Sequence, residues 1–353
     1  MGMGSMADRL RFGVAGLGRI GWCYHCAEIH RNELCELAAV ADTDPGRRAE
    51  AESAYGCRAF ADFDEMISSG LIDAVVIATP THLHEAMACS ALDKGLHVIL
   101  EKPMAPDLAA AMRIVEAASR AHRQITVYQP HRLRAYFQHI LRIVSSGLIG
   151  RVTSVQRACF GFGRRNDWQS LKRFGGGMLN NYGAHYVDQI LQLIGYDVER
   201  VFCSLQLVAT LGDADDVVKA VIVTSGGVTG DLLINQASTA SPYEFVVYGT
   251  CGSLELAGGS LKLRCFDPAC LGEKRLDCSL MSEGRRYPSD KPDMREELIP
   301  VDSSLEVNLY SDFVQAVEQG RKPYVPVDET IAVMKVLDAC RRDAGPEADL
   351  RRP

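Results

Sequence analysis

The sequence predicts an α/β protein with an N-terminal doubly wound parallel sheet and a C-terminal α+β domain built on a large open, mainly antiparallel sheet. Three observations predict this fold class. Short apolar runs alternate with helical stretches as far as residue 128, a glycine-rich turn follows the first run, and strands joined by short turns dominate the second half. We expect one domain over residues 8–128 and the other over residues 129–345.

The first domain is expected to contain parallel strands separated by helices. The run from Ile72 to Ala78 is too apolar for a half-exposed strand, which indicates a sheet covered on both faces. Asp62 is a suitable cap for a short helix that Gly70 ends. The expected strands cover residues 10–15, 37–41, 72–78, 96–100 and 125–128. After the glycine-rich turn and its helix, the expected helices cover residues 45–55, 60–69, 84–94 and 107–122.

The turn at residues 16–21 has the spacing of a dinucleotide-binding loop. Gly16 permits a tight turn, Gly18 lets the backbone approach a pyrophosphate, and Gly21 lets the following helix lie close to the strand. Asp42 lies 21 residues past Gly21, at the end of the next strand. A carboxylate there can accept hydrogen bonds from both ribose hydroxyls of NAD and would repel a 2′-phosphate. The sequence therefore predicts a Rossmann-type site for NAD.

Polar residues that follow the other strands are expected at the same crevice, because ligands of such sheets bind at the carboxyl ends of the strands. NAD is preferred over NADP because Asp42 is followed by Thr43, although Arg47 and Arg48 come soon after. The candidate cofactor-binding residues from this reasoning are Gly16, Gly18, Arg19, Ile20, Gly21, Asp42, Thr43, Ala78, Thr79, Pro80, Glu101 and Lys102.

The second domain begins near Gln129, where the pattern changes. Turns such as residues 225–227 indicate hairpins. Residues 213–216, which are mostly Asp, are expected to form another turn, and residues 271–300 a surface loop. The expected strands cover residues 151–158, 198–208, 217–224, 228–236, 245–248, 253–256 and 261–266. The expected helices cover residues 135–146, 182–194, 311–319 and 328–342.

Composition excludes several classes of function. A net charge of −7 without any Lys/Arg-rich run argues against a nucleic-acid partner. No apolar stretch approaches the ~18 residues of a membrane helix, and residues 1–6 lack the features of a signal peptide, so we expect a cytoplasmic protein. The 12 cysteines are then expected as free thiols. Cys23 and Cys26 form a CxxC inside a helix, and no second motif completes a metal set, so no metal is expected.

Four stretches in order resemble the Gfo/Idh/MocA family, named for glucose–fructose oxidoreductase, inositol dehydrogenase and a rhizopine-catabolism protein. They are Gly13–Gly21, Ala78–His84, Glu101–Lys102–Pro103 and Gly175–Asp188. The resemblance extends from Arg11 to about Ala344. It implies an NAD(P)-dependent oxidoreductase acting on sugars, polyols or cyclitols, assembled as a homodimer or homotetramer through the open sheet. It also places His84 beside the cofactor.

The expected catalytic residues are Lys102, His185 and Asn181. Oxidation of a secondary alcohol needs a base for the hydroxyl proton and a positive group for the developing alkoxide. Lys102 stands at a strand end and suits the second role, and the pKa of a histidine suits proton transfer near neutrality. Asn181 lies one helical turn before His185 and is expected to position His185 or the substrate. The resembling family most often has Asp there, so Asn181 lowers the expected basicity of His185.

Further residues are substrate candidates. Arg132 resembles one of a pair of basic residues in the family and could instead bridge the domains. Arg165 could bind a carboxylate or phosphate, Trp168 could stack on a sugar ring, and Tyr182 could share the polar contacts of Asn181. Two other readings stay open: a redox-neutral NAD-using enzyme of the glycosidase or epimerase type, and a non-catalytic NAD-sensing regulator.

Overall fold

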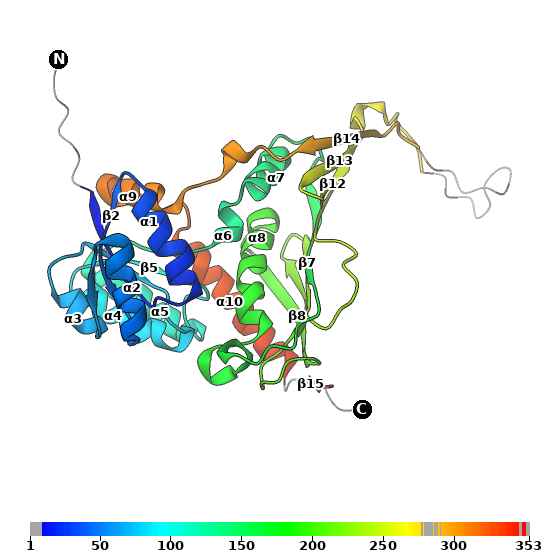
Figure 1. Ribbon diagram of the computed structural model, residues 1–353. Coiled ribbons are helices and arrows are strands. Elements are labelled where there is room, and N and C mark those ends of the chain that lie inside the picture. Colours follow the sequence, from blue (N-terminus) through cyan, green and yellow to red (C-terminus); the bar gives the residue numbers. More distant parts are fainter. Residues whose placement is uncertain are drawn as a thin grey trace, which may run out of the picture.

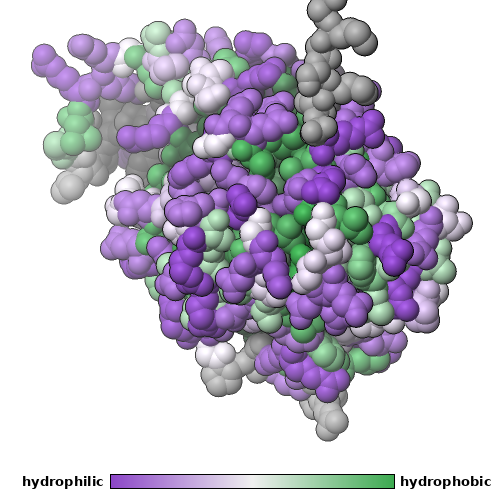
Figure 2. Space-filling view, turned by 90° about the vertical axis from the view of Figure 1, so that its left-hand side faces the viewer, coloured by the Kyte–Doolittle hydropathy of each residue, from purple (hydrophilic) through white to green (hydrophobic). Residues whose placement is uncertain are grey.

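The computed structural model describes residues 9–276, 278, 285, 289, 291–345 and 348–350. Two sheets lie side by side, each with helices packed on it (Figure 1). The first domain carries the blue and cyan elements, and the second sheet stands on the other side of the molecule. Hydrophilic side chains cover most of the first domain's outer side, with smaller hydrophobic areas between them (Figure 2).

The first sheet is parallel and has the order β3-β2-β1-β4-β5-β6, which confirms the doubly wound prediction. The strand order reverses at β1, so a crevice is expected between the carboxyl ends of β1 and β4. The strands are β1 Leu10–Ala15, β2 Cys35–Ala41, β3 Arg58–Phe60, β4 Ala74–Ile77, β5 His97–Leu100 and β6 Ile125–Val127.

The sequence prediction was wrong about Phe60, which belongs to β3 and not to the following helix. A strand of three residues is too short to show an alternation of apolar and polar side chains. The helix begins at Phe63, because the carboxylate of Asp62 caps it by accepting a hydrogen bond from the Glu65 amide. The helices of this domain are η1 Gly21–Cys26, α1 Ala27–Arg31, α2 Pro45–Tyr55, α3 Phe63–Ser68, η2 Thr81–Leu83, α4 His84–Asp93 and α5 Leu108–Ala121.

The second sheet is mixed and mainly antiparallel, with the order β14-β13-β12-β11-β7-β10-β9-β8-β15. Within it, β10 pairs parallel with β7, and β15 with β8. The strands are β7 Val152–Phe160, β8 Val198–Leu207, β9 Val217–Thr224, β10 Thr229–Asn235, β11 Phe245–Gly249, β12 Gly252–Ala257, β13 Ser260–Cys265, β14 Arg295–Pro300 and β15 Ala348–Asp349. The expected loop at residues 271–300 therefore ends in a strand, and part of that loop lies outside the described residues.

Helices cover one face of the second sheet: α6 Pro130–Leu133, α7 Ala135–Ser145, α8 Ala184–Ile194 and α10 Val327–Ala344. Helix α10 contacts α8 and β8 on one side and α5 and β6 on the other, so it joins the two domains (Figure 1). Helix α9, Leu309–Gln319, lies beside α1 and packs Tyr310 and Phe313 on Phe12 of the first domain. No helix among the described residues is long and apolar enough to cross a membrane.

Candidate active site

The glycine-rich turn has the geometry that its sequence predicts. Gly16 has φ +90°, and a Cβ there would lie 2.8 Å from the Ala78 carbonyl oxygen. A Cβ on Gly21 would lie 1.8 Å from the Gly16 carbonyl oxygen, so only glycine lets η1 pack against the turn. A Cβ on Gly18 would meet no protein atom within 4 Å. Because Gly18 has no Cβ, a ligand has room at the start of η1. The turn therefore fits a dinucleotide phosphate.

Asp42 lies against this turn. Its carboxylate accepts hydrogen bonds from the amides of Leu17 at 2.7 Å and Asp44 at 2.9 Å. Arg47 Nη1 lies 3.6 Å from the same carboxylate. Arg48 donates to the backbone carbonyl oxygens of Asp42 and Thr43. The carboxylate is thus fixed beside the glycine turn, where it can accept hydrogen bonds from a ribose.

His84 links the segments that follow β4 and β5. Its ring nitrogens lie 2.9 Å from the Thr79 carbonyl oxygen and 3.1 Å from the Pro103 carbonyl oxygen. Burial lowers the pKa of this fully enclosed imidazole. Because a neutral ring has one N–H, it donates to one of the two carbonyls at a time. The buried side chain thus positions these two loops, and the expectation that His84 lies beside the cofactor stays a prediction.

Glu101 is buried beneath the same edge of the sheet. It pairs with His25 Nε2 at 3.0 Å and accepts from the Lys102 amide at 3.1 Å, and His25 Nδ1 lies 2.6 Å from the Tyr310 hydroxyl. Burial opposes ionisation of Glu101, but the hydrogen bond and charge of His25 and the charge of Lys102 outweigh it and lower the pKa of Glu101. Glu101 therefore stays ionised and holds the strand end that carries Lys102.

The side chain of Lys102 reaches across to the second domain. Its Nζ donates to Asn181 Oδ1 at 2.8 Å and to the Asn181 carbonyl oxygen at 3.1 Å. Burial lowers the pKa of Lys102; the carboxylate of Glu101 opposes this shift, and the positive charges of Arg165 and Arg19 add to it. The structure thus brings Lys102 of the first domain and Asn181 of the second together.

Asn181 belongs to a π-helical turn, η5 Leu179–Gly183, that precedes α8. The acidic segment before β9 fixes this turn, because Asp215 accepts from the Leu179 amide at 2.8 Å. A π turn places residues four apart out of line, so Asn181 faces Lys102 and Gln169. The expectation that Asn181 positions His185 is wrong, because Gln129 holds that histidine.

His185 Nδ1 lies 3.0 Å from Gln129 Oε1. The amide nitrogen of Gln129 faces the Ala184 carbonyl oxygen at 3.5 Å, which turns Oε1 toward the ring and assigns the proton to Nδ1. Nε2 is then the basic nitrogen. Burial, then the charges of Lys102, His131 and Arg157, hold the pKa of His185 well below its usual value, contrary to the expected titration near neutrality.

Sequence reasoning did not place Gln129 or His131 beside His185. The ring of His131 lies 4.6 Å from that of His185, and burial, assisted by Arg157, lowers the pKa of His131 to about 3. Gln129 and His131 follow β6, just as Lys102 follows β5. Their position at the carboxyl end of a parallel strand is the sequence signal that could have placed them at the site.

Arg132 is not placed to bind substrate. Its buried guanidinium pairs with both carboxylate oxygens of Asp188 on α8 and with Glu329 on α10. These contacts join α6 to α8 and α10 within the second domain, so Arg132 does not form the bridge between domains that the sequence left open.

Of the remaining candidates, Arg165 and Trp168 lie in the segment before Gly175, and Tyr182 lies in η5. Arg165 pairs with Asp167 at 2.6 Å, and its charge acts on Lys102. Trp168 is 40% exposed, and the Tyr182 ring lies 5.7 Å from that of Tyr186 on α8. Among the described residues, no group of three His, Cys, Asp or Glu side chains could hold a metal ion, and the cysteines are free.

Two family models match most of the chain. Residues 10–129 match the family model for the GFO_IDH_MocA oxidoreductases, with an NAD-binding Rossmann fold, and residues 137–255 match the GFO/IDH/MocA C-terminal domain. The uncharacterized oxidoreductase ORF334 of Rhizobium meliloti is 27% identical over 343 residues, covering 96% of this chain and 97% of its own. The inositol 2-dehydrogenase of Pseudarthrobacter chlorophenolicus is 30% identical over 234 residues, covering 65% and 68%.

A solved structure supports the same fold. The WlbA dehydrogenase of Bordetella pertussis, in complex with NADH and UDP-GlcNAcA, superposes with a TM-score of 0.76 at 24% identity, covering 95% of this chain and 96% of its own.

Proposed function

The chain belongs to the Gfo/Idh/MocA family of NAD-binding oxidoreductases, and from that premise we propose that it moves a hydride between NAD and a secondary alcohol or ketone carbon of a sugar, sugar derivative or cyclitol. The names of two relatives support this substrate class: one is an inositol 2-dehydrogenase, and the other is a dehydrogenase in complex with a UDP-sugar.

One observation carries the proposal. Lys102 follows β5 and His185 is held by Gln129, which follows β6, and the charge of Lys102 adds to burial in lowering the pKa of His185. A cationic donor beside a neutral base is the pair that alcohol oxidation needs.

The residues have distinct tasks in this reaction. NAD, when bound, supplies the hydride acceptor, and the glycine turn and Asp42 would hold it. His185 Nε2 takes the hydroxyl proton, because Gln129 keeps the other ring proton on Nδ1. Lys102 donates a hydrogen bond to the same oxygen and stabilises the negative charge that develops there. Asn181 holds Lys102 in place from the second domain. In the reverse direction, protonated His185 returns the proton.

The cofactor preference in this proposal is NAD over NADP. Asp42 would repel a 2′-phosphate, and its carboxylate already holds the nearby Arg47.

The assembly in this proposal is a homodimer or homotetramer in the cytoplasm. The helix-free face of the second sheet presents Phe202, Tyr248 and Leu298, which are exposed although large and hydrophobic. Burying such a face against another copy would remove apolar area from water.

The first experiment removes bound nucleotide and follows NADH absorbance with sugars, sugar acids and inositols. We expect NADH formation on one substrate class, lost in Lys102→Met and His185→Ala while both variants still bind NADH. Substrate turnover without net NADH would instead support a redox-neutral enzyme, for which the uncharged Asn181 beside Lys102 is the supporting observation. NADH binding without turnover of any compound would contradict the proposal and favour a sensing role.

A further inference from the structure

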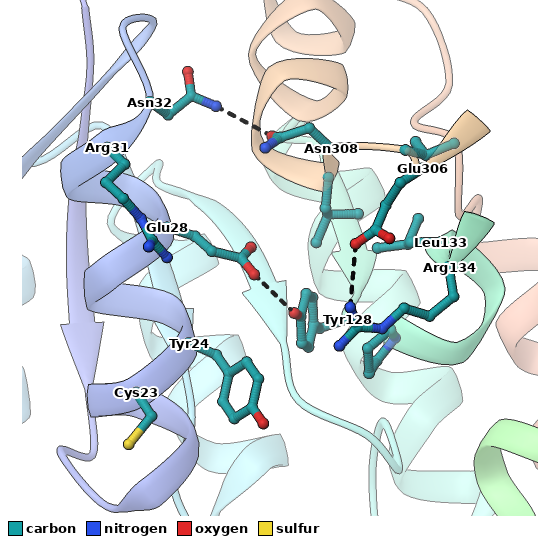
Figure 3. A pocket seen from close by; sticks show the side chains of 13 residues that line it. Cys23, Tyr24, Glu28, Arg31, Asn32, Tyr128, Leu133, Arg134, Glu306 and Asn308 are labelled. Carbon is teal, nitrogen blue, oxygen red and sulfur yellow. Dashed lines mark hydrogen bonds and ion pairs between the residues drawn. The ribbon is translucent and has the colours of Figure 1, made fainter. Parts of the chain in front are cut away.

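A groove of about 560 Å³ runs along the flank of η1 and α1, between the two domains (Figure 3). One wall is the helix from Cys23 to Arg31, and the other is α6 and Arg134 with the segment that leads into α9. Tyr128, at the end of β6, lies between the walls. None of the residues assigned above to cofactor or catalysis lines it, so the proposed chemistry leaves this groove unexplained.

The ionisable lining of the groove is balanced in charge. Glu28 and Glu306 carry negative charge, and Arg31 and Arg134 carry positive charge. Arg134 pairs with Glu306 at 3.2 Å, and Glu28 accepts from the Tyr128 hydroxyl at 3.3 Å (Figure 3). Burial raises the pKa of Glu28, against the charge of His25. Such a lining gives no net attraction for a phosphate or a carboxylate, and it favours a neutral ligand.

The same groups suit a ligand that carries many hydroxyls. Carboxylate, guanidinium and amide groups each present two polar atoms in one plane, and can therefore bond two neighbouring hydroxyls. Asn32 and Asn308 add two amides at one end of the groove, where they bond each other at 3.1 Å. The Tyr24 ring stands near Tyr128 and offers an apolar face to the C–H side of a sugar ring (Figure 3).

The groove adjoins the candidate catalytic centre. Pro130 lines it, and the residues on either side, Gln129 and His131, are the two that contact His185. The Tyr128 ring also packs edge-on against that of His25, with centroids 4.7 Å apart, and His25 bonds Glu101 next to Lys102. The strand end that carries Gln129, Pro130 and His131 is thus shared by the groove and by the contacts of His185.

We propose that the groove binds a second, neutral sugar unit, so that the substrate is a glycoside or oligosaccharide and not a free monosaccharide. The inference rests on the proposed function for the position of the reacting carbon. The choice of a neutral sugar as the ligand rests on the paired acidic and basic side chains and the two tyrosines that line the groove.

The test measures binding to the protein–NADH complex by calorimetry with cellobiose, maltose and trehalose, each compared with glucose. We expect one disaccharide to bind at least tenfold more tightly than glucose. Glu28→Gln, which keeps the size of the side chain and removes its charge, should abolish that advantage and leave glucose binding unchanged. Tyr24→Leu is a second variant with the same expected effect. Glu116→Gln, on the exposed face of α5, is the matched control and should change neither affinity.

Equal affinity for every disaccharide and for glucose would overturn the proposal, as would an equal loss of both affinities in Glu28→Gln. Failure of the proposed function is distinguishable, because the binding measurement needs no turnover. Tight disaccharide binding that depends on Glu28, without oxidation of any sugar, would support the groove and contradict the dehydrogenase. Oxidation of free monosaccharides at full rate, with no effect of Glu28→Gln, would support the dehydrogenase and contradict the sugar site in the groove.

Discussion

Lys102 Nζ donates two hydrogen bonds to Asn181, to the side-chain oxygen at 2.8 Å and to the backbone oxygen at 3.1 Å. The amide nitrogen of Asn181 faces Gln169 Oε1 at 3.4 Å, which fixes the orientation of the amide. Lys102 is therefore positioned by a neutral amide. The family that the sequence resembles most often has a carboxylate at position 181. No negative charge at position 181 offsets the burial that lowers the pKa of Lys102.

Replacing this neutral partner should change the pH dependence of turnover. Asn181→Asp places a carboxylate on the ammonium and should raise the pKa of Lys102. Lys102 acts as the protonated donor, so activity is lost as pH rises through its pKa. The alkaline limb of kcat should move to higher pH in Asn181→Asp, measured from the pH profile with saturating substrate. An alkaline limb at the same pH in both proteins would show that Lys102 does not set it.

A second prediction concerns the base. His185 must be neutral to accept a proton, and its lowered pKa keeps it neutral well below its usual titration range. The wild-type rate should therefore stay level as pH falls through about 6.5. Gln129→Glu would put a carboxylate on Nδ1 and raise the pKa of His185, moving the acid limb of kcat to higher pH. Identical acid limbs would mean that another group accepts the proton.

Cofactor choice should depend on Asp42 and its neighbour Arg47. Asp42→Ser removes the ribose acceptor and should weaken NADH binding about tenfold or more, the loss expected for hydrogen bonds to a charged group. It also frees Arg47, now 3.6 Å from the carboxylate, to pair with a 2′-phosphate. NADPH binding should improve correspondingly, as measured by cofactor fluorescence.

The double variant Asp42→Ser/Arg47→Ala tests this explanation. It should lose the gain in NADPH affinity and keep the weakened NADH binding. If NADPH binding improved equally in both variants, Arg47 would have no part in the selection.

The doubly wound class of the first sheet could be predicted because its signals are local. Each buried parallel strand is a short apolar run, and the glycine spacing and Asp42 mark where two strands end. Strands β3 and β14 escaped prediction for physical reasons. The first has three residues, and the second lies at the sheet edge with almost every side chain exposed, so neither shows an apolar alternation.

The candidate site could be predicted in part, because Lys102 and His185 occupy recognisable positions in sequence motifs. Their partners could not. His25 and Tyr310 lie 285 residues apart, and Gln129 and His185 lie 56 apart, so only the folded chain brings them together. The π turn at Asn181 also has no signal of its own, and it redirects a side chain that regular helical spacing places beside His185.

The buried pair of Arg132 and Asp188 provides a stability prediction. Asp188→Asn leaves a guanidinium without its main partner inside the protein and should lower the free energy of unfolding by about 3 to 5 kcal/mol, measured by urea denaturation. Arg264→Ala is the control, because its pair with Glu296 is exposed and should contribute about 1 kcal/mol or less. The double variant Arg132→Met/Asp188→Leu removes both charges and should recover most of the loss, since neither ion then has to be buried. If the double variant were as unstable as Asp188→Asn, shape and not charge would determine the contribution of this pair.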